Sequence, residues 1–491
     1  GIVVVIFPDS GERYLSTDLF TEKGETTLRL YNTLTRQKEF FKPLRPEEVR
    51  IYSCGPTVHD VPHIGSYRRF VVSDFLRRYL EYKGYQVKHV TNIVDLADRS
   101  IRGAERTGTD LAAYTTRCLE AFIRDINKLN IKGDESYPRA SEHVDDMIRM
   151  VEKLVGKGYA YEKLRSVYFD ISKFSDYGKL SNIDLSKVQH GRTIDLDDYE
   201  KDSPVDFTLL KRSTLSELKK GVYYKTRWGS VRPSWHLECA VIALKCLGEA
   251  FDIHASGADI TFPHCENVLA IGKAATGRGM ANYWLSTELV MIDGKKMSRS
   301  LGNVLTVEDL EEKGYAGPDI RFFLLGAHYR KPLNFSWGAL ETARNTVRKL
   351  NRFIQRLIRF TPGAGFADTD QWIYDVKHGF GGALDDDLNI SGALACLFDF
   401  INKVNAPLEQ GCLTPQERDR ILEVMRGMDS VLGILHFEEE KVDAEVLGLV
   451  ARRTALRNEK KWAEADAVRA ELAALGVDVY DTPRGSFWRR R

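Results

Sequence analysis

The sequence predicts an α/β fold, followed by an α-helical bundle and a small α+β domain at the C-terminus. Residues 49–54 alternate as a strand does, and Gly55-Pro56 then leads towards apolar residues at helical spacing from Val72 onwards. Residues 347–358 carry an apolar stripe of helical period. Residues 476–480 have the pattern of a short strand close to the chain end. A sheet-based domain therefore comes first and helices follow.

Length and composition exclude several protein classes. A chain of 491 residues is long enough for three or four domains of about 100–200 residues each. No apolar run approaches the roughly 20 residues of a membrane span, and no signal peptide is present, so we expect no membrane partner. Seven scattered cysteines indicate a reducing cytoplasm rather than a disulfide framework. Because the net charge is only +1, a nucleic-acid surface must be a local basic patch, such as residues 484–491.

Two short motifs indicate the halves of one ATP site. They are His63-Ile64-Gly65-Ser66 and Lys296-Met297-Ser298-Arg299-Ser300, about 230 residues apart. Each alone could be a surface turn or an ordinary basic loop. The first falls where a strand passes to a helix N-terminus, whose free N–H groups and dipole favour phosphates. Gly65 allows close approach of a nucleotide, His63 can donate to the α-phosphate, and Lys296 can neutralise the leaving pyrophosphate.

Cys54, Cys239 and His264 are candidate metal ligands. Each follows a predicted strand or opens a predicted helix, at the rim where doubly wound sheets bind ligands. Two thiolates and an imidazole would hold Zn²⁺ and leave room for a substrate. Zinc prefers soft sulfur, whereas shape alone discriminates poorly between side chains of similar size. The spacing alone does not establish the site, because a single cysteine is more often a small buried hydrophobe.

A series of motifs resembles the cysteinyl-tRNA synthetases, a family of class I aminoacyl-tRNA synthetases, over roughly residues 27–491. The resemblance implies a split Rossmann-like catalytic domain that ligates L-cysteine to tRNA(Cys) through a cysteinyl-adenylate. It also implies the use of ATP with Mg²⁺ and of one zinc ion per chain. The motifs occur in the family's order: Tyr52-Ser-Cys54-Gly-Pro-Thr-Val58, the His63 motif, Thr91-Asn92-Ile93, Trp235-His-Leu-Glu-Cys239, Phe251-Asp-Ile-His254, Phe262-Pro-His264, the Lys296 motif, Asp385-Asp-Asp-Leu-Asn389, Lys461-Trp462-Ala-Glu-Ala-Asp466 and Gly485-Ser-Phe-Trp488.

The resemblance also implies roles for single residues. Cys54, Cys239 and His264 would be the zinc ligands. Thr57 and Trp235 would line the cysteine pocket. The remaining site residues would serve the adenylate, with His63, Gly65, Lys296 and Arg299 as catalytic residues and Gly55, Ser66 and Asp259 as further binding residues.

The chain departs from the family pattern at four places. Val268 replaces a glutamate that is the fourth zinc ligand, which leaves three protein ligands unless Cys265 or Glu266 replaces it. Adjacent residues on a helix point about 100° apart, so lower zinc affinity is expected. Arg299 replaces a lysine, and Ser66 replaces an asparagine or histidine. Residues 95–99 read Asp-Leu-Ala-Asp-Arg in place of Asp-x-Asp-Asp-Lys.

Two other functions compete with the synthetase interpretation. Relatives that join activated cysteine to an amino sugar in mycothiol synthesis suggest a ligase for a small amine. The four departures suggest an inactive zinc- or tRNA-binding paralogue. The first alternative is disfavoured by the C-terminal module, which is intact to Trp488, and the second by retention of His63, Lys296 and the three metal-ligand candidates.

The first residues resemble another family. Residues 3–17 are similar to the C-terminal end of pyridoxal-phosphate-dependent cysteine synthase, although an apolar edge strand and a turn would also fit. The segment lacks the Schiff-base lysine, so no pyridoxal-phosphate activity is expected. Because the chain begins with Gly1 rather than Met, we expect a fragment or processed piece of a fusion with an upstream cysteine synthase module.

The expected domains follow from these patterns. By the resemblance, the last domain binds the anticodon, and its candidate base readers are Arg457, Trp462, Asp466 and Asp481, with core packing as the alternative for Trp462. The expected boundaries are 1–27 for a cysteine-synthase-like tail and linker, 28–138 with 232–295 for the catalytic domain, 139–231 for an inserted connective domain, 296–340 for the Lys296 loop and stem-contact region, 341–440 for the helical bundle, and 441–491 for the anticodon-binding domain.

Overall fold

The computed structural model describes residues 27–134, 137–184, 201–203, 205–360, 369–439, 444–475, 477–482 and 485–490. The predicted cysteine-synthase-like tail, residues 1–26, lies outside the described residues. The chain forms two compact units. One comprises Gly1–Phe353 with Phe360–Leu435, and the other comprises Ile354–Arg359 with His436–Arg491. Each unit is described by itself.

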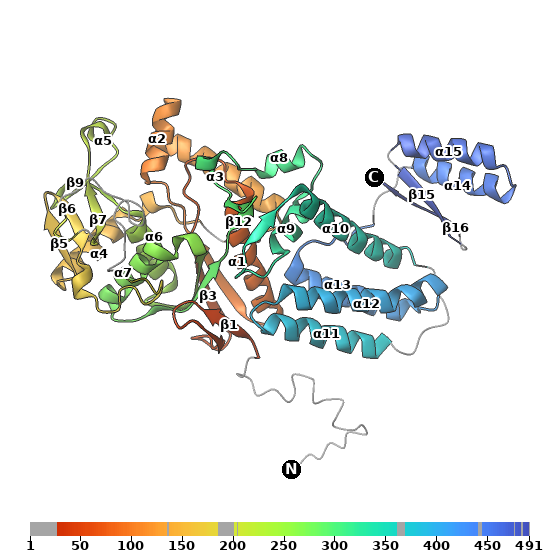
Figure 1. Cartoon of the computed structure of the whole chain (residues 1–491), viewed down its shortest axis with the longest axis horizontal. Coiled ribbons are helices and arrows are strands. Elements are labelled where there is room, and N and C mark those ends of the chain that lie inside the picture. The colour runs from red at the N-terminus through yellow and green to blue at the C-terminus, as the bar shows by residue number, and fades with distance from the viewer. Residues whose placement is uncertain are drawn as a thin grey trace, which may run out of the picture. The chain divides into compact units, whose positions relative to one another are not determined.

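A parallel sheet forms the centre of the first unit. Its four strands lie in the order β11 (Met280–Thr287), β10 (Ala250–Gly257), β3 (Glu48–Ser53) and β4 (Gln86–Thr91). Helix α1 (Ile64–Tyr82) connects β3 to β4, and Figure 1 shows it on one side of β3, with α6 (Trp235–Leu247) and α7 (Glu266–Thr276) on the other. This arrangement confirms the predicted α/β class and the Rossmann-like sheet.

An inserted region separates the two halves of the parallel sheet in the sequence. Its five antiparallel strands lie in the order β5-β6-β7-β9-β8. Phe169, Phe207 and Trp228 share one core with Leu237 and Val268 of the parallel-sheet half, so the insertion packs against it. Apart from β10, the α-helices and strands between β4 and β11 are α2 (Asp98–Thr107), α3 (Leu111–Lys128), α4 (Val144–Gly156), β5 (Ala160–Lys163), β6 (Ser166–Phe169), β7 (Phe207–Arg212), α5 (Leu215–Lys219), β8 (Tyr224–Thr226), β9 (Gly229–Pro233), α6 (Trp235–Leu247) and α7 (Glu266–Thr276).

A small sheet and a set of helices follow the parallel sheet. Strand β12 (Val290–Ile292) lies between β13 (Lys295–Lys296) and β14 (Leu333–Phe335). Helices α11, α12 and α13 lie side by side in Figure 1, and α13 packs against α1. The other bounds are β1 (Arg29–Asn32), β2 (Gln37–Phe40), α8 (Val307–Glu311), α9 (Gly317–Leu325), α10 (Trp337–Ile358), α11 (Thr369–Asp385), α12 (Ile390–Gln410) and α13 (Pro415–Leu432).

The second unit is a small α+β fold. It contains α14 (Ala444–Asn458), α15 (Trp462–Ala474) and the antiparallel pair β15 (Val477–Thr482) and β16 (Gly485–Arg490). Its core is formed by Val446, Val468, Leu472, Val477 and Val479. Trp462 is 55% exposed, so the core-packing alternative for this residue is wrong.

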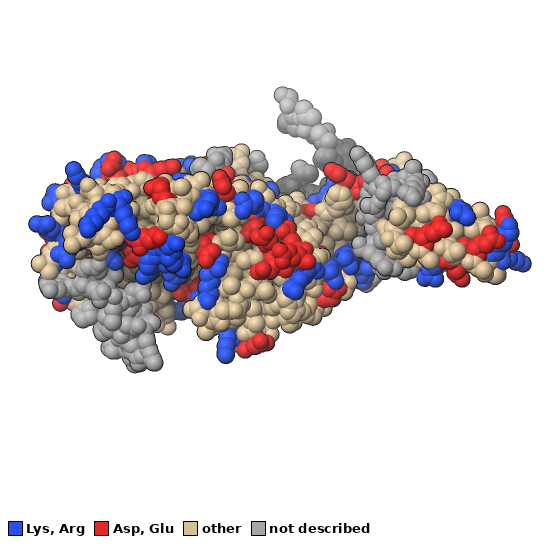
Figure 2. All heavy atoms as spheres, turned by 90° about the horizontal axis from the view of Figure 1, so that it is seen from above, with Lys and Arg blue, Asp and Glu red and all other residues tan. Residues whose placement is uncertain are grey.

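The surface is mixed in charge. Figure 2 shows basic and acidic side chains interspersed on the face that it presents, as the net charge of +1 leads one to expect. Among the described residues, no helix combines the length and the apolar character needed to cross a membrane.

Asp74 joins three helices in the interior of the first unit. Its carboxylate, 1% exposed, accepts from Arg321 at 2.5 Å and from Arg78 at 2.7 Å. Arg321 also donates from Nε to the carbonyl of Leu432 at 2.6 Å. Burial by itself would raise the pKa of Asp74, but the two guanidinium groups lower it below its usual value. The carboxylate thus holds α9 and the end of α13 against α1.

We predict that Asp74→Asn lowers the free energy of unfolding by about 3–5 kcal/mol, because it leaves buried guanidinium groups without their counterion. The measurement is urea denaturation followed by circular dichroism. The matched control is Asp399→Asn, which removes the partly exposed 2.9 Å pair with Lys403 on α12. That pair should contribute less than about 1 kcal/mol. Equal effects of the two substitutions would contradict the assigned role of Asp74.

Candidate active site

The candidate site begins where β3 ends. Cys54 follows the strand, and its N–H donates to the carbonyl of Ala255 on β10 at 3.2 Å. The N–H of Gly55 donates to Oδ1 of Asn92, just past β4, at 2.8 Å. A Cβ atom at Gly55 would lie 1.4 Å from the carbonyl oxygen of Asn92, so only glycine fits there. Three neighbouring strands thereby fix the backbone around Cys54.

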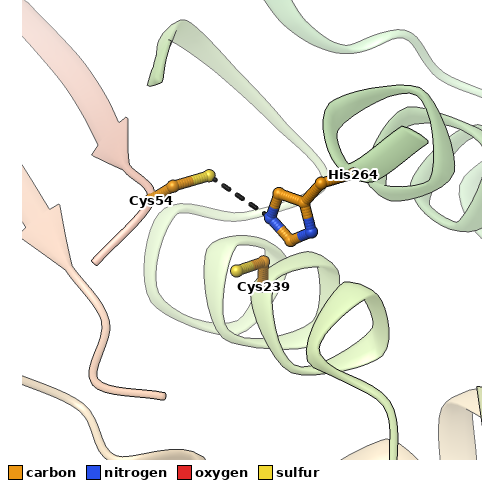
Figure 3. A group of neighbouring side chains, drawn as sticks. All are labelled: Cys54, Cys239 and His264. Atoms are coloured by element: carbon orange, nitrogen blue, oxygen red, sulfur yellow. Dashed lines mark hydrogen bonds between the residues drawn. The ribbon is translucent and has the colours of Figure 1, made fainter. Parts of the chain in front are cut away.

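Cys54, Cys239 and His264 converge in a buried cluster. Their sulfur and nitrogen atoms lie within 4.8 Å of one another, and Figure 3 shows the three side chains pointing towards one point. Cys54 Sγ is 3.6 Å from His264 Nε2. A tetrahedral zinc with bonds of about 2.3 Å to sulfur and about 2.0 Å to nitrogen separates such ligand atoms by roughly 3.5 Å. The donor set and its spacing therefore fit zinc.

Neighbouring aromatic rings orient His264. Its Nδ1 lies 3.0 Å from Nδ1 of His236, which leaves Nε2 facing Cys54. Trp235 stacks on the ring with centroids 3.9 Å apart and planes at 13°. Burial lowers the pKa of His236 well below its usual value, so this ring is neutral and can accept the Nδ1 proton of His264. A hydrogen bond to the second nitrogen is the usual support of a metal-binding histidine.

The pKa values of the two cysteine thiols in the cluster are shifted in opposite directions. The hydrogen bond from Cys54 lowers the pKa of Cys239 well below that of an ordinary thiol. The same bond raises the pKa of Cys54. Asn92 Nδ2 also lies 3.6 Å from Cys239 Sγ. The pKa values of the two thiols are thus shifted in opposite directions, and a bound metal ion would displace the protons that remain on them.

A cavity of about 940 Å³ brings the two predicted ATP motifs together. His63 occupies the N-cap position of α1. A Cβ at Gly65 would lie 3.0 Å from the His63 ring and 3.3 Å from the sulfur of Met297. Glycine therefore keeps the space between the two motifs open. The predicted residues that line the cavity are Thr57, His63, Gly65, Ser66, Asp259, Lys296 and Arg299.

The loop that carries Lys296 is attached to the rest of the cavity at three points. Lys296 Nζ lies 2.6 Å from a carboxylate oxygen of Asp259. Met297 is buried, with its N–H donating to the carbonyl of Val290 at 3.0 Å. The Arg299 guanidinium lies 3.0 Å from Asp60 and also contacts the carbonyl of Val61. These contacts place two cations opposite the start of α1.

The electrostatic surroundings keep His63 neutral. Burial, together with the positive charges of Arg299 and Lys296, lowers its pKa to about 4. Its Nε2 lies 3.3 Å from the hydroxyl of Ser66. Its Nδ1 is buried and has no hydrogen-bond partner among the described residues. One ring nitrogen of His63 is therefore buried without a bond to the described part of the protein.

Some residues predicted for the site lie away from the cavity, and other residues that were not predicted belong to the site. Gly55 and Trp235 do not line the cavity: Gly55 packs on Asn92, and Trp235 covers His264. His236 and Asn92 were not predicted as site residues. His236 precedes Cys239 by three positions on α6, so the shared helix face was a usable signal. The cavity is also lined by four arginines without a predicted role, Arg69, Arg99, Arg102 and Arg106.

Comparison with known families and proteins gives a consistent result. Residues 40–345 match the catalytic domain of class I (C) tRNA synthetases. Residues 379–436 match the DALR domain, and residues 439–489 match the cysteinyl-tRNA ligase anticodon binding domain. The cysteine–tRNA ligase of Methanosarcina mazei is 41% identical over 93% of this chain and 98% of its own length. That of Thermococcus onnurineus is 40% identical over 94% and 99%.

Solved structures resemble this fold at lower identity. Methionyl-tRNA synthetase of Mycobacterium tuberculosis, in complex with methionyl-adenylate, has a TM-score of 0.58 at 16% identity and covers 79% of this chain and 90% of its own. A leucyl-tRNA synthetase ternary complex of Agrobacterium radiobacter has a TM-score of 0.55 at 11% identity, covering 80% and 85%. These likenesses concern the fold.

We predict that His236→Ala weakens zinc binding about 10- to 100-fold, because His264 loses the acceptor that orients its ring. Competition of the full chain with a fluorescent zinc chelator measures this affinity. His378→Ala is the control, since His378 lies exposed on α11 and bonds only the carbonyl of Tyr374 four residues before it. An unchanged zinc affinity in His236→Ala would show that the contact between the two rings does not support the metal site.

Proposed function

The chain belongs to the cysteinyl-tRNA synthetase family of class I, and we propose that its cavity activates L-cysteine with ATP and transfers it to tRNA(Cys). The supporting observation is the meeting of the His63 and Lys296 motifs in one cavity of about 940 Å³. Thr57 lines that cavity and lies three residues after Cys54 of the metal cluster. The cavity could therefore hold the carboxylate of cysteine while the metal cluster binds the thiol of the same molecule.

Adenylate formation needs positioning and charge more than proton transfer. The carboxylate of cysteine attacks the α-phosphorus of ATP, and the bond to the bridging oxygen of pyrophosphate breaks. Because the carboxylate is already a nucleophile, no general base is required. His63 would donate from its free ring nitrogen to the α-phosphate, and Gly65 would let the phosphates approach α1. Mg²⁺ would accompany ATP.

Lys296 and Arg299 would neutralise the leaving pyrophosphate. Both side chains face acidic partners, Asp259 at 2.6 Å and Asp60 at 3.0 Å. Each pair is partly exposed, so exchanging the carboxylate for a phosphate would cost little. Asp259 would then be free to bind the nucleotide, which is the role the family resemblance gives it. Ser66 would support the His63 ring through the contact at 3.3 Å.

Cys54, Cys239 and His264 would hold one zinc ion. When bound there, zinc supplies a soft Lewis acid that prefers the thiolate of cysteine to the hydroxyl of serine. The protein residues supply the rest of the selection: Trp235 covers His264, and Asn92 holds Cys239 and Gly55 in place. The site is fully buried, so the substrate side chain would enter a pocket without bulk water.

The second unit supports tRNA as the acceptor rather than a small amine. Residues 439–489 match an anticodon-binding domain. Trp462 is exposed, and the Arg457 guanidinium lies 5.3 Å from its ring centroid. Such a pair can stack on splayed bases. Arg457, Trp462 and the exposed Asp466 are therefore proposed base readers, whereas the side chain of Asp481 lies outside the described part of the structure.

Two further predictions about the chain remain proposals. A cytoplasmic location agrees with seven cysteines that are all free. The matched family models begin at residue 40, and the resemblance of residues 3–17 to cysteine synthase lies before that point. A link to an upstream cysteine synthase module would require that an adjoining reading frame encode one.

We predict ATP–pyrophosphate exchange that depends on cysteine and does not occur with serine at the same concentration. Exchange of labelled pyrophosphate into ATP measures this reaction, and the zinc content is determined on the same sample. A chain that carries about one zinc ion but shows no exchange with cysteine would overturn the proposal of an active synthetase. Exchange without any charging of tRNA(Cys) would favour a small-molecule acceptor.

Two lysine variants make the exchange experiment specific to the cavity. Lys296→Ala should slow exchange about 10²- to 10³-fold, the usual loss for one charge-stabilising group. Lys295→Ala is the matched control, because Lys295 is the adjacent exposed lysine on β13 and does not line the cavity. Zinc content should be the same in both.

We predict that protonation of His63 does not shape the pH dependence of exchange between about pH 5 and pH 8, where an unperturbed histidine titrates. Its pKa is lowered to about 4, so the ring stays neutral throughout this range and would gain charge only below it. His63→Asn should therefore be slower than the wild type but give a parallel pH profile. A limb near pH 6.5 that is present in the wild type and absent in His63→Asn would contradict this assignment.

A further inference from the structure

We propose that Cys265 is an additional thiolate ligand of the metal at this site, in place of the carboxylate that Val268 cannot supply. The inference rests on the proposed zinc site. It makes the donor set of the free protein three cysteines and one histidine, namely Cys54, Cys239, Cys265 and His264, and the substrate thiolate would be a fifth ligand. All four residues are buried.

Cys54 stands between two groups of possible ligands. It forms one group with Cys239 and His264, and a second with His254 and Cys265, whose donor atoms also lie within 4.8 Å of one another. Its thiol is within hydrogen-bonding reach of both Cys239 and Cys265. The two groups share only Cys54, so a single site requires the Cys265 thiol to approach Cys239 and His264.

The local backbone explains how two adjacent residues can face the same ion. On a regular helix, His264 and Cys265 would point about 100° apart. Here Phe262 is extended at φ −122° and ψ 136°, so the segment Thr261–Cys265 is not one regular helix. Cys265 is the N-cap of α7 rather than a residue inside that helix. Both side chains consequently reach the neighbourhood of Cys54.

Two other residues near His264, Glu266 and Val268, are held by hydrogen bonds or by apolar packing. The carboxylate of Glu266 accepts from the N–H of Gly178 at 2.9 Å and from the N–H and hydroxyl of Ser181 at 2.8 and 2.7 Å. Removing it from these bonds would leave buried donors unpaired. Val268 is fully buried in the apolar core. Of the two replacements that the sequence leaves open, Cys265 and Glu266, only the cysteine lies in a cluster with Cys54.

His254 is the competing fourth donor. Its Nε2 lies 3.8 Å from Cys54 Sγ. However, its ring is stacked on Trp284 with centroids 4.2 Å apart and planes at 22°, and the residue lies within the central strand β10. Moving it towards Cys239 would break that packing. Cys265 comes from the same turn as His264, and sulfur is the softer donor for zinc.

The exchange of ligands also conserves charge. Two thiolates and one carboxylate carry the same formal charge as three thiolates. When zinc binds, the proton of the Cys265 thiol passes to solvent. The charge that the substitution at Val268 removes is therefore restored by the residue three positions before it.

Zinc X-ray absorption of the wild-type full chain tests the ligand set directly. We expect three sulfur atoms at about 2.3 Å and one nitrogen at about 2.0 Å. Two sulfurs with two nitrogen or oxygen ligands would overturn the proposal for Cys265 and leave the proposed synthetase function standing. A chain that binds no zinc would overturn both.

Cobalt substitution of variants supplies an independent count. The thiolate-to-cobalt charge-transfer absorbance per bound Co²⁺ should fall by about one third in Cys265→Ser, since one of three soft ligands is lost. Cys239→Ser calibrates the loss of one thiolate. Cys412→Ser, in the loop before α13, is the matched control and should leave the absorbance unchanged. An unchanged absorbance per cobalt in Cys265→Ser would contradict the proposal, and the wild-type measurement decides if that variant does not fold.

Discussion

The pairing of β3 with β10 is the interaction on which the site depends. Ile51 lies opposite Ile253 and Ser53 opposite Ala255, although the two strands are about 200 residues apart in the sequence. Because parallel strands end at the same edge of a sheet, this pairing sets Cys54 beside the segment that leads from β10 to His264. The insertion between the halves can then be long without disturbing the site, since loop closure costs little more as a loop lengthens.

Burial gives this edge two different chemical environments. At the metal cluster, burial and the contact between the thiols make the pKa of each cysteine depend on its neighbour, so that the pKa of Cys239 is lowered and that of Cys54 is raised. At the cavity, His63 is only partly buried and faces the cations Lys296 and Arg299, which keeps it neutral. A buried cluster of sulfur and nitrogen donors and a cavity that carries two cations thus both follow β3. Such a division suits a substrate with a thiol at one end and a reactive carboxylate at the other.

Local patterns predicted the elements better than the contacts between them. The strand ending at Cys54 and the helix after His63 were predicted because alternation and helical spacing are local properties. The sequence could place His264 near a metal only through a family resemblance, and it could not choose between Cys265 and Glu266. That choice depends on the bonds of Glu266 to Gly178 and Ser181, about 85 residues away, which no periodicity records. The exposure of Trp462 was undecided for the same reason.

The arginine at position 299 illustrates how a departure from a family pattern can be accommodated by the fold. A lysine ammonium is a compact point charge, whereas a guanidinium is a planar fork with several donors. Arg299 uses this shape to reach both the carboxylate of Asp60 and the carbonyl of Val61. These residues stand just before His63, so the fork ties the loop of one motif to the entrance of the other. A positive charge next to the cavity is retained. The arginine also attaches the loop that carries Lys296 to both Asp60 and Val61.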